Sequence, residues 1–148
     1  MKEEKVRIKK LDENAIIPTY GTNYAAGCDI YAKVDKEEVI NPGETKLIKT
    51  GIAMEVPVGY AALIYARSGL ASKKGLAPAN KVGVVDSDYR GEIMVALHNH
   101  SKEVRKIEDG ERIAQIVITP YIKAVFEEVE ELDETKRGEN GFGSTGNK

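Results

Sequence analysis

The sequence is poor in the residues that mark secreted and metal-binding proteins. Its 148 residues include 1 cysteine, 2 histidines, 2 phenylalanines and no tryptophan. The lone Cys28 excludes an intramolecular disulfide, and the polar start MKEEKVRIKK lacks the apolar segment of a secretory signal, so we expect a cytoplasmic protein. Because His98 and His100 are the only histidines, we expect no metal site built from protein ligands alone.

The chain also lacks a strong charge of either sign and any long apolar run. A formal net charge of -2 and a pI near 5.8 provide no basic field for binding a nucleic-acid backbone. No apolar stretch approaches the roughly 18 residues that a membrane span needs. Nucleic acids and membranes are therefore not expected partners. The length suits one domain with a single core.

Short apolar runs separated by Gly, Pro and Asn predict an all-β sandwich, jelly roll or barrel of roughly ten strands. One short helix is expected over residues 68–74, with Ser68 as its N-cap and Gly75 just past its end. The runs expected to form strands are 6–10, 28–32, 39–40, 46–49, 52–56, 60–66, 82–85, 93–98, 112–118 and 122–129.

The segment 83–91, GVVDSDYRG, concentrates charge between two apolar runs. This pattern predicts two strands that return on each other through a charged tight turn. Asp86 follows the first run directly, where rigid strands could hold its carboxylate as a general base toward water. A solvated, Asp-rich hairpin turn is the alternative that the pattern alone leaves open.

Three other places have both a functional and a structural interpretation. The amides that open the expected helix, together with Ser68 and Arg67, form a candidate phosphate site, or else an ordinary surface cap. Asp29 interrupts an alternating strand and is either a ligand-binding group or a solvent-exposed one. Gln115 lies in an apolar strand, where its amide makes either a core hydrogen bond or a ligand contact.

The chain changes character at residues 133–148, DETKRGENGFGSTGNK, which show no strand alternation and by composition predict disorder. Phe142 stands there among glycines and hydroxyl groups. A mobile flap would use such a ring to stack on a planar ligand, while Arg137, Ser144 and Thr145 reach a phosphate. A stray aromatic residue in a linker is the other interpretation.

Five segments resemble, in order and spacing, the five motifs of the trimeric deoxyuridine triphosphate nucleotidohydrolases, the dUTPases. They are AAGCDIYA, ARSGLASKKG, NKVGVVDSDYRGEI, GERIAQIVI and RGENGFGSTG. The resemblance implies a jelly-roll domain over residues 1–132 and a flexible tail over 133–148 that closes a neighbouring subunit's site. It also implies a homotrimer and Mg²⁺-dependent hydrolysis of dUTP to dUMP and pyrophosphate, which limits uracil incorporation into DNA and supplies dUMP for thymidylate synthesis.

The same resemblance implies a role for each motif residue. Asp86 would orient and deprotonate the water that attacks the α-phosphorus, and Tyr89 would lie where a ribose 2′-hydroxyl would collide. Asp29 would hold waters of a Mg²⁺ bound mainly by the phosphates. Asn80 would read the edge of the uracil and Phe142 would cover it, while Val84, Met94 and Gly143 would contact the substrate. The phosphates would contact Arg67, Ser68, Gly69, Gln115, Arg137, Ser144 and Thr145.

Two rival functions are weighed against this one. Deoxycytidine triphosphate deaminases share the fold and look similar around the third motif, but they carry a catalytic glutamate ten residues beyond the aspartate matched by Asp86. This chain has Ala96 there, which removes the group needed for attack at C4. A non-catalytic β trimer that senses nucleotides or binds a protein is the other rival. The motif residues with reactive side chains are all present, which favours hydrolysis.

Overall fold

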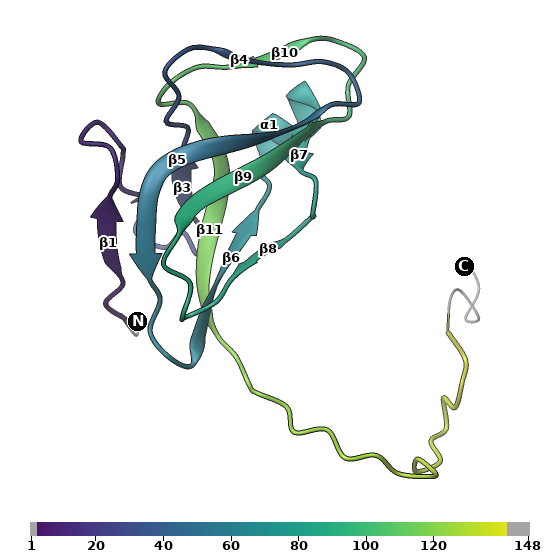
Figure 1. Cartoon of the computed structure of the whole chain (residues 1–148). Helices are drawn as coiled ribbons and strands as arrows, with labels where there is room; N and C mark the ends of the chain where they lie inside the picture. The colour runs from purple at the N-terminus through teal and green to yellow at the C-terminus, as the bar shows by residue number, and fades with distance from the viewer. Residues whose placement is uncertain (1–2, 142–148) are drawn as a thin grey trace.

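A computed structural model describes residues 3–141 and confirms the all-β prediction (Figure 1). Within that range it has one short helix, α1 (Ser68–Lys74), and eleven strands. The strands are β1 (Arg7–Lys10), β2 (Thr19–Tyr20), β3 (Cys28–Tyr31), β4 (Glu38–Ile40), β5 (Thr45–Glu55), β6 (Tyr60–Tyr65), β7 (Leu76–Pro78), β8 (Gly83–Val85), β9 (Glu92–Asn99), β10 (Arg105–Ile107) and β11 (Arg112–Pro120).

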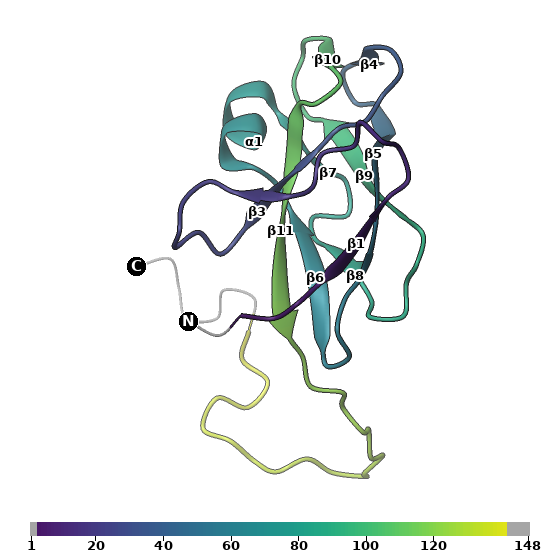
Figure 2. The ribbon, with the colours of Figure 1, turned by 90° about the vertical axis from the view of Figure 1, so that its left-hand side faces the viewer.

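Two antiparallel sheets pack together in the predicted jelly-roll arrangement. One has the order β1-β5-β9-β7 and the other β2-β3-β11-β6-β8, while β10 and β4 form a small ribbon at one end (Figures 1 and 2). Strand β9 alternates strictly, so that Ile93, Val95 and Leu97 are buried in the core. The opposite face of β9 therefore presents Glu92 and Met94 away from the core.

Strand β5 is one element, although the sequence predicted two strands on either side of Gly51. The ladder with β9 pairs Lys49 with Met94 and then Ala53 with Glu92, so a bulge interrupts it. Gly51 sits in this bulge with a φ of 67°. A Cβ there would lie 2.9 Å from the Cβ of Ala15, so the bulge requires glycine.

The prediction of a hairpin over residues 83–91 is wrong. Its two strands exist, but β8 pairs with β6 in one sheet whereas β9 pairs with β5 and β7 in the other. Alternation of apolar and polar residues identifies a strand but does not show which strand it pairs with. Here each of the two strands pairs with a strand that is distant in the sequence. The charged turn therefore crosses between the sheets at a corner of the sandwich.

The helix has the predicted bounds, but its N-cap is Arg67 and not Ser68. No side-chain hydrogen bond caps it, because Ser68 is already the first helical residue. Gly75 ends the helix in the left-handed conformation, as predicted, and its N–H bonds to the carbonyl of Ala71 at 3.1 Å. None of the helical structure in residues 3–141 is long and apolar enough to cross a membrane.

The strand predicted over residues 122–129 is also wrong, because the chain forms no strand between residues 121 and 141. Both views show this segment leaving the foot of β11 and running away from the sheets (Figures 1 and 2). Ile122, Val125 and Phe126 are more than nine-tenths exposed. An apolar pattern of this kind becomes a strand only where a partner strand is available. The short strands β2, β7 and β10 were not expected, since each is too brief to show alternation.

Candidate functional site

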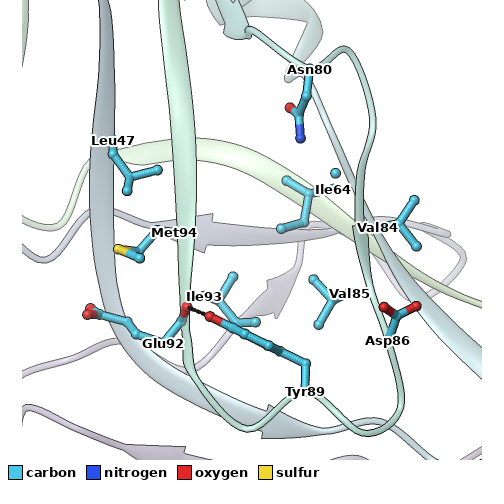
Figure 3. Close-up of a pocket in the computed structure, with 11 residues that line it drawn as sticks. Leu47, Ile64, Asn80, Val84, Val85, Asp86, Tyr89, Glu92, Ile93 and Met94 are labelled. Atoms are coloured by element: carbon cyan, nitrogen blue, oxygen red, sulfur yellow. Dashed lines mark hydrogen bonds between the residues drawn. The ribbon is translucent and has the colours of Figure 1, made fainter.

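A pocket of about 260 Å³ opens where the chain crosses between the sheets (Figure 3). It is formed by the end of β8, the charged turn, the start of β9 and the loop after β7. Its lining residues are Leu47, Ile64, Asn80, Gly83, Val84, Val85, Asp86, Tyr89, Glu92, Ile93 and Met94. Five predicted site residues, Asn80, Val84, Asp86, Tyr89 and Met94, thus come together.

Asp86 reaches the pocket because it directly follows the buried Val85 at the end of β8. The turn after it is held by its own backbone and by Arg90. The N–H of Tyr89 donates to the carbonyl of Asp86 at 3.2 Å, and Arg90 Nη1 donates to the carbonyl of Ser87 at 2.7 Å. The exposed carboxylate of Asp86 makes no hydrogen bond or ion pair with any residue from 3 to 141. It is therefore available to accept a proton from water.

Tyr89 forms one end of the pocket. Its hydroxyl donates to the carbonyl of Glu92 at 2.9 Å, as the dashed line in Figure 3 marks. A Cβ at Gly91 would lie 2.4 Å from that hydroxyl oxygen, so the turn folds back over the ring only because residue 91 is glycine. The ring is thus fixed by one hydrogen bond and one close backbone contact.

Asn80 lies at the other end of the pocket (Figure 3). The loop that carries it is tight, since Lys81 has a φ of 64° and its N–H donates to the carbonyl of Pro78 at 3.1 Å. A Cβ at Gly83 would lie 3.3 Å from Asn80 Nδ2, so glycine lets the amide approach the strand. An amide at one end, a ring at the other and an apolar floor between them suit a small planar polar group.

A second cluster of predicted residues surrounds Asp29 on β3. Asp29 Oδ1 accepts from Arg67 Nε at 2.7 Å, and Oδ2 accepts from Arg112 Nη1 at 3.3 Å. Gln115 pairs with Asp29 across the ladder of β11 and β3, and its Nε2 donates to the carbonyl of Ala66 at 2.8 Å. Two guanidinium groups and an amide gathered at the start of α1 can receive an anion such as phosphate.

The start of α1 adds two exposed residues to this second cluster, Ser68 and Gly69. Neither they nor any other member of the cluster lines the pocket. One chain therefore presents the candidate site as two separate halves, the pocket and the cluster around Asp29. Arg137 belongs to neither half and donates through Nε to the carbonyl of Asn140 at 2.9 Å. The remaining tail residues, Phe142, Gly143, Ser144 and Thr145, lie outside the described residues.

The sequence reasoning missed Glu92, Arg112, Gly27 and Gly91. Arg112 shares Asp29 with Arg67, while Gly27 makes room for Gln115, because a Cβ at residue 27 would lie 2.4 Å from Gln115 Oε1. The signal that could have found the two glycines is their place inside the motifs, beside side chains that need space. Glu92 and Arg112 also lie inside the motifs, but nothing in the sequence identified their partners, which become neighbours only in the fold.

The donor set around Asp29 fits a water-mediated contact with a hydrated cation better than a direct metal site. Residues 3–141 hold no group of three or more His, Cys, Asp or Glu side chains placed to bind a metal. Both Asp29 oxygens already accept from a guanidinium, but a carboxylate has about four acceptor positions in all. Each oxygen can thus still accept from a water of hydrated Mg²⁺.

The chain is similar to known proteins over nearly its whole length. The dUTPase family model matches residues 13–146. The chain is 54% identical to the deoxyuridine 5′-triphosphate nucleotidohydrolase of Nautilia profundicola, with 96% of this chain and 99% of that protein covered. It is 47% identical to the protein of that name from Syntrophotalea carbinolica, with 99% of each covered. The solved structure of Staphylococcus bacteriophage 80alpha dUTPase with dUPNHPP superimposes with a TM-score of 0.87 at 32% identity, covering 97% of this chain and 99% of that one.

Proposed function

The chain belongs to the dUTPase family, and on that premise we propose that it is a dUTP diphosphatase that cleaves dUTP to dUMP and pyrophosphate. The observation that carries this function is Asp86, exposed and unpaired within the described chain at the rim of the pocket that also holds Asn80 and Tyr89. Hydrolysis of dUTP limits uracil incorporation into DNA and supplies dUMP for thymidylate synthesis. A cytoplasmic location stays a prediction of the sequence.

In the proposed mechanism, Asp86 accepts a proton from a water and aims that water at the α-phosphorus, in line with the leaving pyrophosphate. Positioning contributes as much as proton transfer, since phosphoryl transfer depends mainly on alignment and charge stabilisation. The exposed carboxylate suits this role because its lone pairs are not used by other groups of the described chain.

The pocket would hold the nucleoside. Asn80 would hydrogen-bond the edge of uracil, while Val84 and Met94 would contact the apolar faces of the base or sugar. Tyr89, fixed by its bond to the Glu92 carbonyl, would pack on the deoxyribose and leave no room for a 2′-hydroxyl. Selectivity for a deoxynucleotide would thus be steric.

The cluster around Asp29 would receive the phosphates. Arg67 and Gln115 would donate to phosphate oxygens, together with Ser68 and Gly69 at the start of α1. When bound, Mg²⁺ would neutralise charge on the phosphate oxygens, with Asp29 accepting from one of its waters. Arg112 would keep the Asp29 carboxylate oriented through its 3.3 Å ion pair.

We propose further that three chains assemble and share their sites. The two halves of the site lie apart within one chain, so a pocket from one chain would meet a phosphate cluster from another. The apolar segment after β11 supports this, because Ile122, Val125 and Phe126 are almost fully exposed in the single chain and would be buried against a second copy. The tail, with Arg137, Phe142, Gly143, Ser144 and Thr145, would close over the site.

The assignment of Asp86 is tested by Asp86→Asn, which keeps size and most polarity but removes the base. The variant should bind dUTP nearly as well as the parent, while kcat falls by roughly 10² or more. Asp88→Asn is the matched control, since Asp88 is an exposed carboxylate of the same turn that does not line the pocket. Proton release with dUTP and Mg²⁺ measures the rate, and near-normal turnover by Asp86→Asn would contradict the proposal.

The same enzyme should release no ammonia from dCTP. Residue 96, where the related deaminases carry their catalytic glutamate, is an alanine on β9 and does not line the pocket. Ammonia detection after incubation with dCTP would check this, and positive release would revive deamination as a function.

Sharing of the site is tested by complementation between two inactive chains. One parent ends at Lys136 and lacks the tail, while the other is full-length Asp86→Asn. After refolding in equal amounts, random assortment should give roughly a quarter of sites an intact Asp86 and an intact tail from different chains. Activity should therefore reappear in the mixture. If mixed trimers form and remain as inactive as their parents, the tail and the base act within one chain.

A further inference from the structure

Glu92 connects the pocket to the bulge of β5 through two hydrogen bonds. Its backbone carbonyl accepts the hydroxyl of Tyr89 at 2.9 Å, and its side-chain Oε1 accepts the N–H of Gly51 at 2.9 Å. The side chain is half-buried at the first position of β9 and lines the pocket itself. One residue thus contacts both the ring at the end of the pocket and the neighbouring strand.

The bulge of β5 directs a backbone donor at this carboxylate. Three residues of β5, Thr50, Gly51 and Ile52, lie opposite the single residue Ile93 of β9. The Thr50 hydroxyl donates to the Ile93 carbonyl, which fixes one side of the bulge. The other side is fixed by Glu92, because the buried Gly51 N–H donates to its carboxylate. A buried N–H that loses its acceptor is strongly disfavoured, so this bond matters to the local structure.

We propose that Glu92 is a positioning residue that determines substrate selectivity. Its carboxylate anchors the start of β9 to the β5 bulge, and the anchored carbonyl in turn holds the hydroxyl of Tyr89. The proposal deepens the proposed function and rests on it, since it takes the Tyr89 ring to be the barrier to a 2′-hydroxyl. What the site needs from residue 92 is an acceptor oxygen at the correct reach, and not its negative charge.

Three substitutions separate reach from charge. Glu92→Gln keeps an acceptor oxygen at the same distance, whereas Glu92→Asp keeps the charge but is one methylene too short, and Glu92→Ala removes both. The ratio of kcat/KM for dUTP to that for UTP should fall about fivefold or more in the Asp and Ala variants, the scale of one lost hydrogen bond. In the Gln variant it should stay within about twofold of the parent.

A purely structural glutamate provides the control. Glu44 also accepts a backbone N–H, that of Asn41 at 2.8 Å, in a turn that does not line the pocket. Glu44→Ala should lower stability without changing the dUTP to UTP ratio. Tyr89→Phe, which removes the donor to the Glu92 carbonyl, should lower the ratio by itself, and adding Glu92→Ala should lower it little further because both changes break one chain of contacts.

Hydrogen exchange gives a measurement that needs no substrate. In the Ala and Asp variants the amide of Gly51 and the segment 89–94 should exchange faster than in the parent, and in Glu92→Gln they should not. An unchanged dUTP to UTP ratio in both the Ala and Asp variants would overturn the proposal, and faster exchange with that unchanged ratio would leave Glu92 as a structural anchor only. If Glu92→Ala does not fold, the comparison of Asp with Gln decides alone. A parent chain inactive toward dUTP would refute the proposed function, while the exchange comparison would still judge the anchoring by Glu92.

Discussion

Gly27 leaves the space that the side chain of Gln115 occupies, and we predict that alanine at this position displaces the Gln115 amide. An alanine Cβ at residue 27 would lie 2.4 Å from Gln115 Oε1 and 3.2 Å from Cδ, whereas ordinary contacts begin at 3.4 Å. The amide of Gln115 must therefore retreat by about 1 Å, which breaks its 2.8 Å bond to the carbonyl of Ala66. Gly27 has no positive φ, so the backbone itself accepts alanine.

The expected cost of Gly27→Ala is one lost hydrogen bond, about 1 kcal/mol of unfolding free energy. Since Gln115 is also proposed to contact a phosphate, kcat/KM for dUTP should fall roughly fivefold to tenfold. Gly21→Ala is the matched control, because a Cβ there meets no atom of the described chain within 4 Å. Steady-state kinetics and urea unfolding of both variants test the prediction.

The steric reasoning has its own check in a double variant. Gln115→Ala removes the side chain that the new methyl would strike, so Gly27→Ala should cost little on that background. If Gly27→Ala alone keeps parental stability and kcat/KM, or if its cost is unchanged when Gln115 is absent, the clash is not the reason for glycine at this position.

Three further predictions concern other regions. Tyr89→Ala should raise activity toward UTP relative to dUTP, because the ring that excludes a 2′-hydroxyl is gone; an unchanged ratio in competition kinetics would place the sugar barrier elsewhere. Burial raises the pKa of the Cys28 thiol, and this effect outweighs the opposing hydrogen bond from Tyr20. Iodoacetamide at pH 8 should therefore label Cys28 only after unfolding. Rapid labelling of the folded protein, detected by mass spectrometry, would contradict this. Asn99→Ala should lower the free energy of unfolding, measured in urea, by roughly 2–4 kcal/mol. The fully buried amide of Asn99 forms hydrogen bonds with Ile40, Ser101 and Glu103, and all of them would be lost. A loss below about 1 kcal/mol would refute this prediction.

Local patterns predicted elements well and their partners poorly. The alternation over residues 93–98 identified β9, and Gly75 identified the end of α1, because both signals lie within a few residues. The pairing of Val85 with Ala62 was not foreseeable from the charged turn, which looked like a hairpin. Residues 122–129 looked like a strand because apolarity does not reveal whether a partner lies in the same chain.

The site shows the same division. Asn80, Asp86 and Tyr89 were expected to act together, and the pocket brings them together. All three lie in one motif, residues 80–93, so a local segment was enough to predict them as a group. Glu92 and Arg112 escaped notice because their partners, the Gly51 amide and the Asp29 carboxylate, meet them only across strand pairs. Their chemistry becomes visible only once strand register is known.

With the proposed assembly, the exposed segment after β11 would make the stability of this protein depend on its concentration. A lone chain leaves Ile122, Val125 and Phe126 in water, and burial of each such side chain is worth about 1.5–3 kcal/mol. If a second copy covers the segment, as proposed above, that free energy is released on assembly, and the melting temperature should then rise with total protein and fall on dilution. Newly made chains would expose this apolar segment until they assemble, and during that time aggregation would compete with correct assembly. Substitutions in this segment would thus alter yield and assembly rate while leaving the chemistry of each completed site intact.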